Sequence, residues 1–217
     1  MDSIQFIRTL QLSDSFFPVG AFAYSDGLET ATTSGLVRDA VSLGKWMDHY
    51  LDNVFVPCEG LALVKAMLAL KKSDIENLIS LDEELSAIRT SRAGRAASSG
   101  VGKRLLSVCS EFTSISLPQS NAAIAYAVVF FRSGVDEKHA ALAYGYNRLT
   151  GIVSCGLRLI SMGQQLGQEL LTRTLERLPD AVDRILQTTN EPLRSFSPLL
   201  DIQQMNHQYV YSRLFRS

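Results

Sequence analysis

Apolar side chains recur along most of the chain at spacings of three and four residues, which is the period of an amphipathic α-helix. Leu43, Trp46 and Tyr50 lie on one such face, and Pro57 is expected to end the helix that carries them. The longest periodic segment covers residues 142–160. Strand-type alternation around an Asn-Gly or Asp-Gly turn does not occur. The pattern predicts an all-α, single-domain bundle of about eight to ten helices.

Local signals place several helix boundaries. Ser73 is predicted to cap the start of a helix, and Asp136 suits the first turn of a later one. A helix that carries Leu85 is expected to continue without a break to Leu105. The acidic run at residues 82–84 is interpreted as a helix start, where carboxylates complement the helix dipole.

Glycines punctuate the long segment and its continuation. A glycine inside a helix costs roughly 0.5–1 kcal/mol relative to alanine, and close approach of another backbone is the usual reason to find one there. We therefore interpret them as contacts of a tightly packed central helix, with a functional kink as the alternative. They are Gly145, Gly151, Gly156, Gly163 and Gly167.

Composition and charge exclude several classes of partner. Lys and Arg total 21 against 22 Asp and Glu, so no overall field favours nucleic acid or an anionic membrane. The three cysteines lie far apart, as expected in a reducing compartment. The longest apolar run, 122–131, has ten residues, whereas a membrane span needs about 20. We expect a soluble, cytoplasmic protein with no nucleic-acid partner and no membrane partner.

Signatures of nucleotide and metal chemistry are incomplete in the sequence. Residues 99–104 are similar to a phosphate-binding loop, but Ala97 and Arg104 stand where that loop needs Gly and Ser or Thr. None of the three histidines has a second histidine or a cysteine at metal-ligand spacing. We therefore expect no catalytic residue, no metal site and no cofactor.

A cluster of basic residues follows the acidic run and allows two interpretations. It is either a solvated helix face or a docking surface for an acidic or nucleotide-bearing partner, because arginine suits carboxylate and phosphate. Interleaved aromatic residues, which would favour nucleic acid, are missing. The cluster comprises Arg89, Arg92, Arg95, Lys103 and Arg104.

Two segments differ from generic helix. The first, residues 18–29, combines a Pro-x-Gly turn with closely spaced aromatic residues and a second glycine. The second, residues 207–217, gives the end of the chain an unusual content of aromatic, Leu and Arg residues. Chain ends usually fray, so such a composition favours a covering partner.

Together these segments resemble the UreF family of urease accessory proteins. The family signature P-[VIT]-G-[GA]-F-[AS]-[YH]-S-x-G-L-E is satisfied at every position from Pro18 to Glu29. Its C-terminal pattern H-E-x-x-Y-S-R-L-F-x-S is satisfied except at Gln208, where the family has glutamate, and it ends at Ser217. The resemblance extends over nearly the whole chain.

The resemblance implies an all-α protein without catalysis of its own. Members act with the UreD/UreH scaffold and the UreG GTPase in GTP-dependent nickel insertion into urease apoprotein, and they pair as homodimers. The resemblance assigns residues 207–217 as a partner-binding tail within a single domain, 1–217, and assigns the residues of both motifs to partner binding. These are Pro18, Gly20, Phe22, Tyr24, Ser25, Gly27, Glu29, His207, Tyr211, Arg213, Leu214 and Phe215.

Alternatives remain for both the function and the tail. The chain could be an all-α metal- or diphosphate-dependent enzyme, or a helical regulator. We expect the tail to be mobile until it docks on the scaffold. The alternative is a last helix folded onto the protein's own core.

Overall fold

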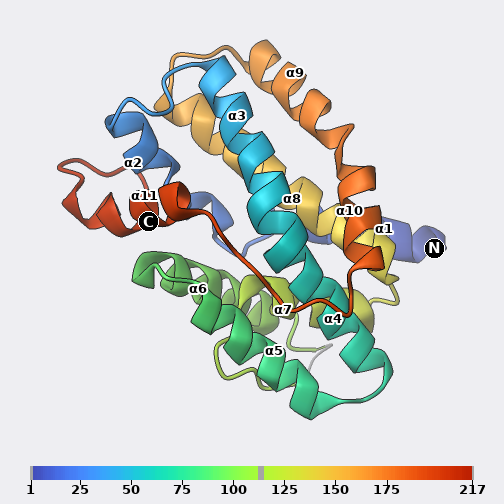
Figure 1. Cartoon of the computed structure of the whole chain (residues 1–217). Helices are drawn as coiled ribbons and strands as arrows, with labels where there is room; N and C mark the ends of the chain where they lie inside the picture. The colour runs from blue at the N-terminus through green and yellow to red at the C-terminus, as the bar shows by residue number, and fades with distance from the viewer. Residues whose placement is uncertain (1, 112–114, 217) are drawn as a thin grey trace.

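The computed structural model describes residues 2–111 and 115–216, so Ser217 of the second motif lies outside the described residues. Within these ranges the chain forms helices and loops and no β-strand, which confirms the all-α prediction (Figure 1). The α-helices are α1 (Ser3–Ser13), α2 (Leu28–Thr33), α3 (Ala40–Tyr50), α4 (Gly60–Lys71), α5 (Ile75–Ile88), α6 (Arg92–Val108), α7 (Ala122–Arg132), α8 (Glu137–Leu159), α9 (Gln164–Leu175), α10 (Leu178–Gln187) and α11 (Pro198–Asn206). Short 3₁₀ turns are η1 (Ala21–Ala23) and η3 (His207–Tyr209).

The core is built around one long helix. Helix α3, the π-helical stretch η2 (Leu51–Glu59) and α4 run without interruption from Ala40 to Lys71 and contact α5, α7, α8 and α10. By length and composition this helix could cross a membrane, but 72% of its apolar window is buried inside the molecule. It is therefore the core helix of the bundle. Helix α7, buried along nearly its whole length, packs beside α4 and α6.

Three predicted helix boundaries are wrong. Pro57 does not end its helix, because the chain widens into a π-helix there. Ser73 has a positive φ of 55°, and the next residue, Asp74, caps α5 instead. The helix through Leu85 breaks before α6, which starts afresh where the Ser91 hydroxyl accepts from Gly94 N at 3.2 Å.

The acidic run does not mark a helix start either. Asp82 lies in the middle of α5 and is fully buried. Its carboxylate accepts the backbone N–H groups of Ser120 and Asn121 at 2.9 and 2.8 Å, at the start of α7. A buried helix N-terminus leaves N–H groups without partners, and Asp82 supplies an acceptor for them from another helix.

The glycines of α8 divide into two groups. A Cβ at Gly145 would lie 2.6 Å from Leu178 Cδ1, and one at Gly156 would lie 2.5 Å from Leu43 Cδ2. These two sites confirm the tight packing that the sequence predicts. Gly151 has open space instead, so packing does not explain it.

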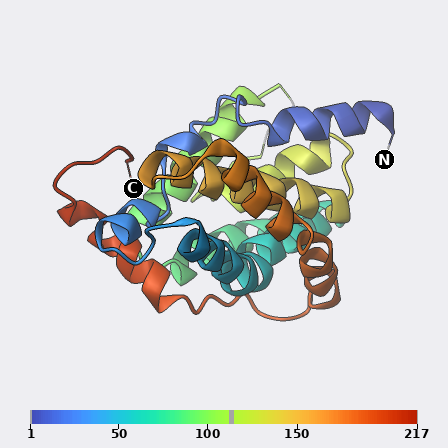
Figure 2. The ribbon, with the colours of Figure 1, turned by 90° about the horizontal axis from the view of Figure 1, so that it is seen from above.

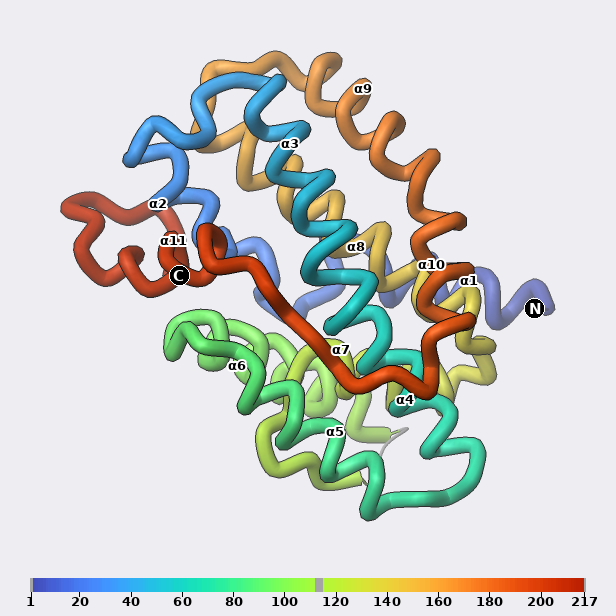
Figure 3. The backbone as a smooth tube through the Cα atoms, in the orientation of Figure 1, coloured from blue at the N-terminus to red at the C-terminus, as the bar shows by residue number. Residues whose placement is uncertain are grey.

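The fold brings the two ends of the sequence into different surroundings. Helix α1 lies at one end of the molecule, and the C-terminal segment lies at the other (Figure 2). After α10, residues 188–197 cross the front of the bundle as an extended strap (Figure 3), where Arg194 N donates to Pro57 O at 2.9 Å. At the end of the strap, α11 packs against α2 and α6. The second motif therefore reaches the first.

Candidate functional site

The first motif forms a loop that requires unusual backbone angles. Gly20 and Gly27 have φ values of +73° and +88°, the left-handed region that favours glycine, and Asp26 adopts +51°. A Cβ at Gly27 would also lie 3.0 Å from Gln204 N in α11. The turn therefore needs glycine at both positions for its backbone angles, and α11 also needs the space beside Gly27.

Glu29 joins the two motifs. It is 3% exposed, in the first turn of α2, and its carboxylate accepts from three groups of the C-terminal segment. Glu29 Oε2 lies 2.8 Å from His207 Nε2, and Glu29 Oε1 accepts from Leu214 N at 2.5 Å. Phe215 N is 3.3 Å from Oε2. A buried carboxylate must be paired to be tolerated, and here its partners lie 178 to 186 residues away in the sequence.

A second contact holds the end of the chain on the same loop. The Phe215 ring is buried under Arg158, with Arg158 Cζ 4.3 Å from the ring centroid. Arg158 also donates to the carbonyl of Phe22 at 3.3 Å, and Arg216 N donates to Ala23 O at 2.8 Å. Cation–π contact and backbone hydrogen bonds thus fix the last described residues beside η1.

The structure separates the predicted partner-binding residues into two groups. The buried ones, Ser25, Gly27, Glu29, His207 and Phe215, form the junction between the motifs. The exposed ones lie around it and are Pro18, Phe22, Tyr211, Arg213 and Leu214. Gly20 and Tyr24 are half-buried.

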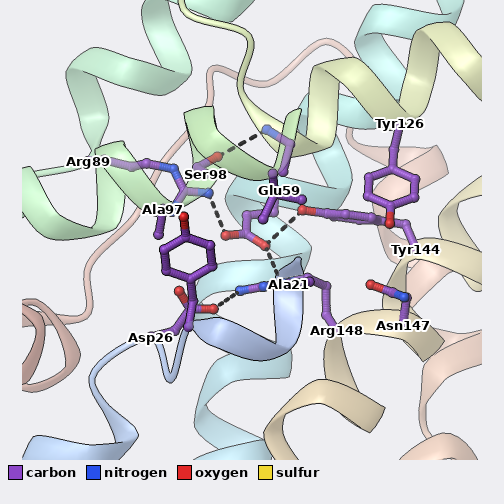
Figure 4. Close-up of a pocket in the computed structure, with 13 residues that line it drawn as sticks. Ala21, Asp26, Glu59, Arg89, Ala97, Ser98, Tyr126, Tyr144, Asn147 and Arg148 are labelled. Carbon is purple, nitrogen blue, oxygen red and sulfur yellow. Dashed lines mark hydrogen bonds and ion pairs between the residues drawn. The ribbon is translucent and has the colours of Figure 1, made fainter. Parts of the chain in front are cut away.

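A second group of charged residues lies in the core, next to the first motif (Figure 4). Glu59, at the end of η2, accepts from Arg89 Nη2 at 2.6 Å and pairs with Arg148 Nε at 3.2 Å. The Tyr50 hydroxyl donates to Glu59 Oε2 at 2.6 Å. Arg148 also pairs with Asp26 of the motif loop at 2.5 Å. We call these five residues the central network.

The surroundings of Glu59 set its charge state. Burial alone would raise the pKa of Glu59, but the charges of Arg148 and Arg89 and the Tyr50 hydrogen bond outweigh it. The pKa of Glu59 is consequently held at about 2. Burial also raises the pKa of the Tyr50 phenol, and there it prevails over the charge of Arg148, so that this pKa lies well above its usual value. The central network therefore contains a permanent carboxylate beside two permanent guanidinium groups.

A small cavity of about 30 Å³ adjoins the central network. Tyr126 Oη and Arg89 Nε line it, and neither has a hydrogen-bond partner among the described residues. A cavity of this size holds about one or two water molecules. This cavity has no room for a group larger than a few water molecules.

The predicted basic cluster does not form one face. Arg89 belongs to the central network, and its side chain is only 15% exposed. Arg95 donates to the backbone carbonyls of Arg89 and Thr90, and Arg104 donates to Pro18 O at 3.2 Å. These guanidinium groups donate to backbone carbonyls at the end of a helix and in a loop. The spacing of three residues in the sequence could not show this.

Sequence reasoning missed the central network, although one signal pointed to it. Glu59 stands between two apolar stretches, on a helix whose neighbouring positions are buried. A charge at a position with an apolar helical register predicts a buried partner. Nothing in the sequence could show that the partners were Arg89 and Arg148.

The side chains that could bind a metal ion do not gather in one place among the described residues. No group of three or more His, Cys, Asp or Glu side chains could hold a metal ion within residues 2–111 and 115–216. His207, the only histidine in a motif, is engaged by Glu29. All three cysteines are buried, and burial raises the pKa of Cys58 and of Cys155 to about 12. Such thiols are protonated and weakly reactive at neutral pH.

The fold and the site define an all-α protein with three buried carboxylates among its described residues, Asp82, Glu59 and Glu29, the last of which anchors an apolar loop at the surface. A family model described as UreF matches residues 37–175. The chain is 34% identical over 220 residues to the urease accessory protein UreF of Microcystis aeruginosa (strain NIES-843 / IAM M-2473), covering 100% of both chains. It is 32% identical over 219 residues to UreF of Nostoc sp. (strain PCC 7120 / SAG 25.82 / UTEX 2576), covering 98% of this chain and 96% of that one. The chain belongs to the UreF family.

The comparisons confirm the resemblance that the two motifs indicate. Both motifs lie outside the segment matched by the family model, but the match to the Microcystis relative covers the whole of this chain and so the residues of both motifs. UreF of Actinobacillus pleuropneumoniae is 30% identical over 220 residues, with 96% of this chain and 97% of that one covered. Similarity therefore extends through the core and through both ends.

Proposed function

We propose that this protein is a non-enzymatic, cytoplasmic chaperone of urease maturation. It docks on the UreD/UreH scaffold and on the UreG GTPase, and it supports GTP-dependent nickel insertion into urease apoprotein by modulating the GTPase. The names of the relatives, urease accessory proteins, support the general role. The rest of the proposal draws on the surface that the two motifs build.

The observation that carries the proposal is the apolar surface beside Glu29. Tyr209, Tyr211 and Leu214 are 77%, 105% and 61% exposed, although the residues on either side of them are anchored. Exposed aromatic side chains held in place are typical of interfaces, where Tyr and Arg concentrate the binding energy. This loop is the proposed docking site of the scaffold.

The GTPase and the nickel chemistry belong to partners in this proposal. Ala97 and Arg104 break the candidate phosphate loop, and α6 carries that segment as regular helix, which offers no cradle for a nucleotide. The protein would then act by holding its partners in position. Calorimetry of the isolated protein should detect no GTP binding at micromolar concentration.

Helix α1 supports the proposed homodimer, because its amphipathic face is inverted. Its buried residues include the polar Thr9 and Ser13, whereas Ile4, Phe6, Ile7 and Leu10 are between 50% and 59% exposed. An apolar stripe turned toward water favours a partner helix. A second copy with the same stripe would provide one, in the self-complementary geometry of a two-fold dimer.

The dimer can be tested by sedimentation. Leu10→Glu should convert the protein to a monomer, whereas Val41→Glu, which changes an apolar residue on α3 that is 69% exposed, should leave the dimer intact. A Leu10→Glu variant that stays dimeric would exclude α1 as the interface.

The chaperone function is tested in cells that lack the endogenous protein. A Tyr211→Ala, Leu214→Ala double variant should fold, fail to co-purify the scaffold, and leave urease with little nickel and little activity. Val41→Ala serves as the control for loss of an exposed apolar side chain elsewhere. Full urease activation by the double variant would contradict the proposed docking site.

A further inference from the structure

The C-terminal segment forms a loop whose two ends meet on one residue. His207 contacts the Glu29 carboxylate through its side chain, and Leu214 contacts it through its backbone N–H. These two residues bracket residues 208–213, which extend away from the protein and are mostly exposed. A single buried carboxylate therefore closes the loop 207–214.

The interior of the loop is fixed by its own arginine. Arg213 donates to Gln208 O at 2.9 Å and to Val210 O at 3.3 Å. These hydrogen bonds connect the two sides of the loop and fix its curved conformation. Tyr209 and Tyr211 lie on the loop with their rings in solvent. The exposed rings therefore lie on a loop whose shape depends on the hydrogen bonds that Glu29 accepts.

We propose that Glu29 is the positioning residue of a preorganised docking loop, residues 207–214, that fits an apolar groove on the partner. This inference rests on the proposed docking of the scaffold and adds how the loop acquires its shape. Glu29 does not touch the partner. It acts through His207 and the amide of Leu214, and so decides whether Tyr209, Tyr211 and Leu214 are presented together.

The energetic reason is the entropy of an open chain end. An unanchored segment must be ordered when it binds, and each immobilised side chain costs about 0.5–1.5 kcal/mol at that moment. Closure on Glu29 orders the segment beforehand, and the buried carboxylate in turn needs the donors of the loop. The loop and Glu29 therefore stabilise each other.

The side chains exposed on the loop 207–214 indicate the kind of surface that it fits. Two tyrosines and a leucine offer apolar area with hydroxyl groups at the edge, and the Arg213 guanidinium is engaged inside the loop. A concave, mainly apolar surface with hydrogen-bond acceptors at its rim is complementary to this face. Arg213 keeps its positive charge, because its partners are neutral backbone carbonyls, so a carboxylate at that rim would also be complementary.

The test compares hydrogen exchange and partner binding for Glu29→Ala and Glu29→Gln in the full-length protein. In the unchanged protein, the amides of Leu214 and Phe215 should be protected. Glu29→Ala should speed their exchange at least tenfold and weaken binding of the purified scaffold at least tenfold. Glu29→Gln keeps one acceptor oxygen and should lie between the two. Thermal melting alone does not decide the matter, because any structural residue would shift it.

The matched control is Glu137→Ala. Glu137 is also a first-turn carboxylate, and it pairs with Lys71 at 2.6 Å, away from the tail. It should leave the exchange of Leu214 and Phe215 unchanged. Should Glu29→Ala fail to fold, His207→Ala opens the same closure from the other side and leaves α2 intact.

The outcomes separate this inference from the proposed function. Unprotected amides at Leu214 and Phe215 in the unchanged protein, or protection that survives Glu29→Ala, would overturn the role of Glu29. Faster exchange with unchanged scaffold affinity would support loop closure by Glu29 and overturn the docking of the scaffold on this loop. A double variant of Glu29 and His207 should bind no more weakly than either single variant, because both residues close the same loop.

Discussion

Glu59 and Glu29 are both almost completely buried carboxylates, yet they are satisfied in different ways. Glu59 is paired with the side chains of Arg89, Arg148 and Tyr50, which come from the helical core and its edge. Glu29 is paired with one histidine side chain and two backbone amides from the last residues of the chain. The first set cannot leave without unfolding the bundle, whereas the second can.

The difference shows how the position of a donor along the chain decides what a buried charge does. Removing one partner of a buried pair leaves an uncompensated charge and is strongly destabilising. At Glu59 that cost holds the bundle together. At Glu29 the same penalty keeps the end of the chain bound, because its release would leave the carboxylate without partners. The buried charge therefore determines the shape of a surface and not of the core.

The largest effect is expected from Glu59→Ala, which leaves two buried guanidinium groups without their carboxylate. We expect a loss of about 3–5 kcal/mol in the free energy of unfolding, measured by urea denaturation. Glu29→Ala should cost less, because its donors can move into water. Equal losses for both variants would remove the distinction between the two carboxylates.

The next effect is a pH dependence of stability. The pKa of Glu59 is held at about 2 in the folded protein, below the ordinary value of 4.5 that applies to the unfolded chain. Its contribution is therefore present above about pH 5 and is lost as the pH falls toward 2, on the order of 3 kcal/mol in total. Glu59→Gln should flatten this part of the stability profile. A profile that is unchanged in the variant would mean that other carboxylates cause the acid unfolding.

Deletion of residues 209–217 should have a smaller effect. It removes two amide donors to Glu29 and the buried Phe215 ring, so we expect a loss of about 1–3 kcal/mol with helical circular dichroism retained. A tail that is mobile until it docks, as the sequence suggested, would leave the melting temperature unchanged. A melting temperature identical to that of the full chain would restore that interpretation, and global unfolding would place the tail in the core.

The smallest effect is expected at an exposed carboxylate. Asp52 pairs with Arg177 at 2.6 Å and with Arg184 at 2.8 Å, and all three side chains are at least one-third exposed. Asp52→Asn should cost less than about 1 kcal/mol, and the difference should disappear in 1 M salt. A larger loss that persists in salt would show that burial is not what separates the carboxylates of this protein.

Much of the helical framework follows from local patterns in the sequence. The periodic segment over 142–160 belongs to α8 and its C-cap Ile160, and Asp136 caps the start of α8 by accepting from His139 N at 3.0 Å. Pro179 lies in the first turn of α10, as helix-start chemistry requires. These features depend on residues within a turn or two of each other, which is the range over which a single sequence is informative.

The pairings that build the site depend on longer distances. Asp82 and Asn121 are 39 residues apart, and Glu29 and His207 are 178 residues apart. The residue types in these pairs, and the residues beside them in the sequence, do not indicate that the two members of a pair are in contact. The two motifs could be recognised from the sequence, but their junction at Glu29 could not, because both were assigned to a partner and not to each other.

The π-helical stretch in the central helix determines which residues share a face. In an α-helix, nine residues advance about two and a half turns, so residues at that spacing point in opposite directions. Hydrogen bonds of the i→i+5 type widen each turn, so that nine residues make about two turns. Tyr50 and Glu59, nine residues apart, therefore meet on one side at 2.6 Å. Removing one residue between them would rotate the carboxylate away from its phenol, so the length of this stretch is as much a part of the site as its side chains.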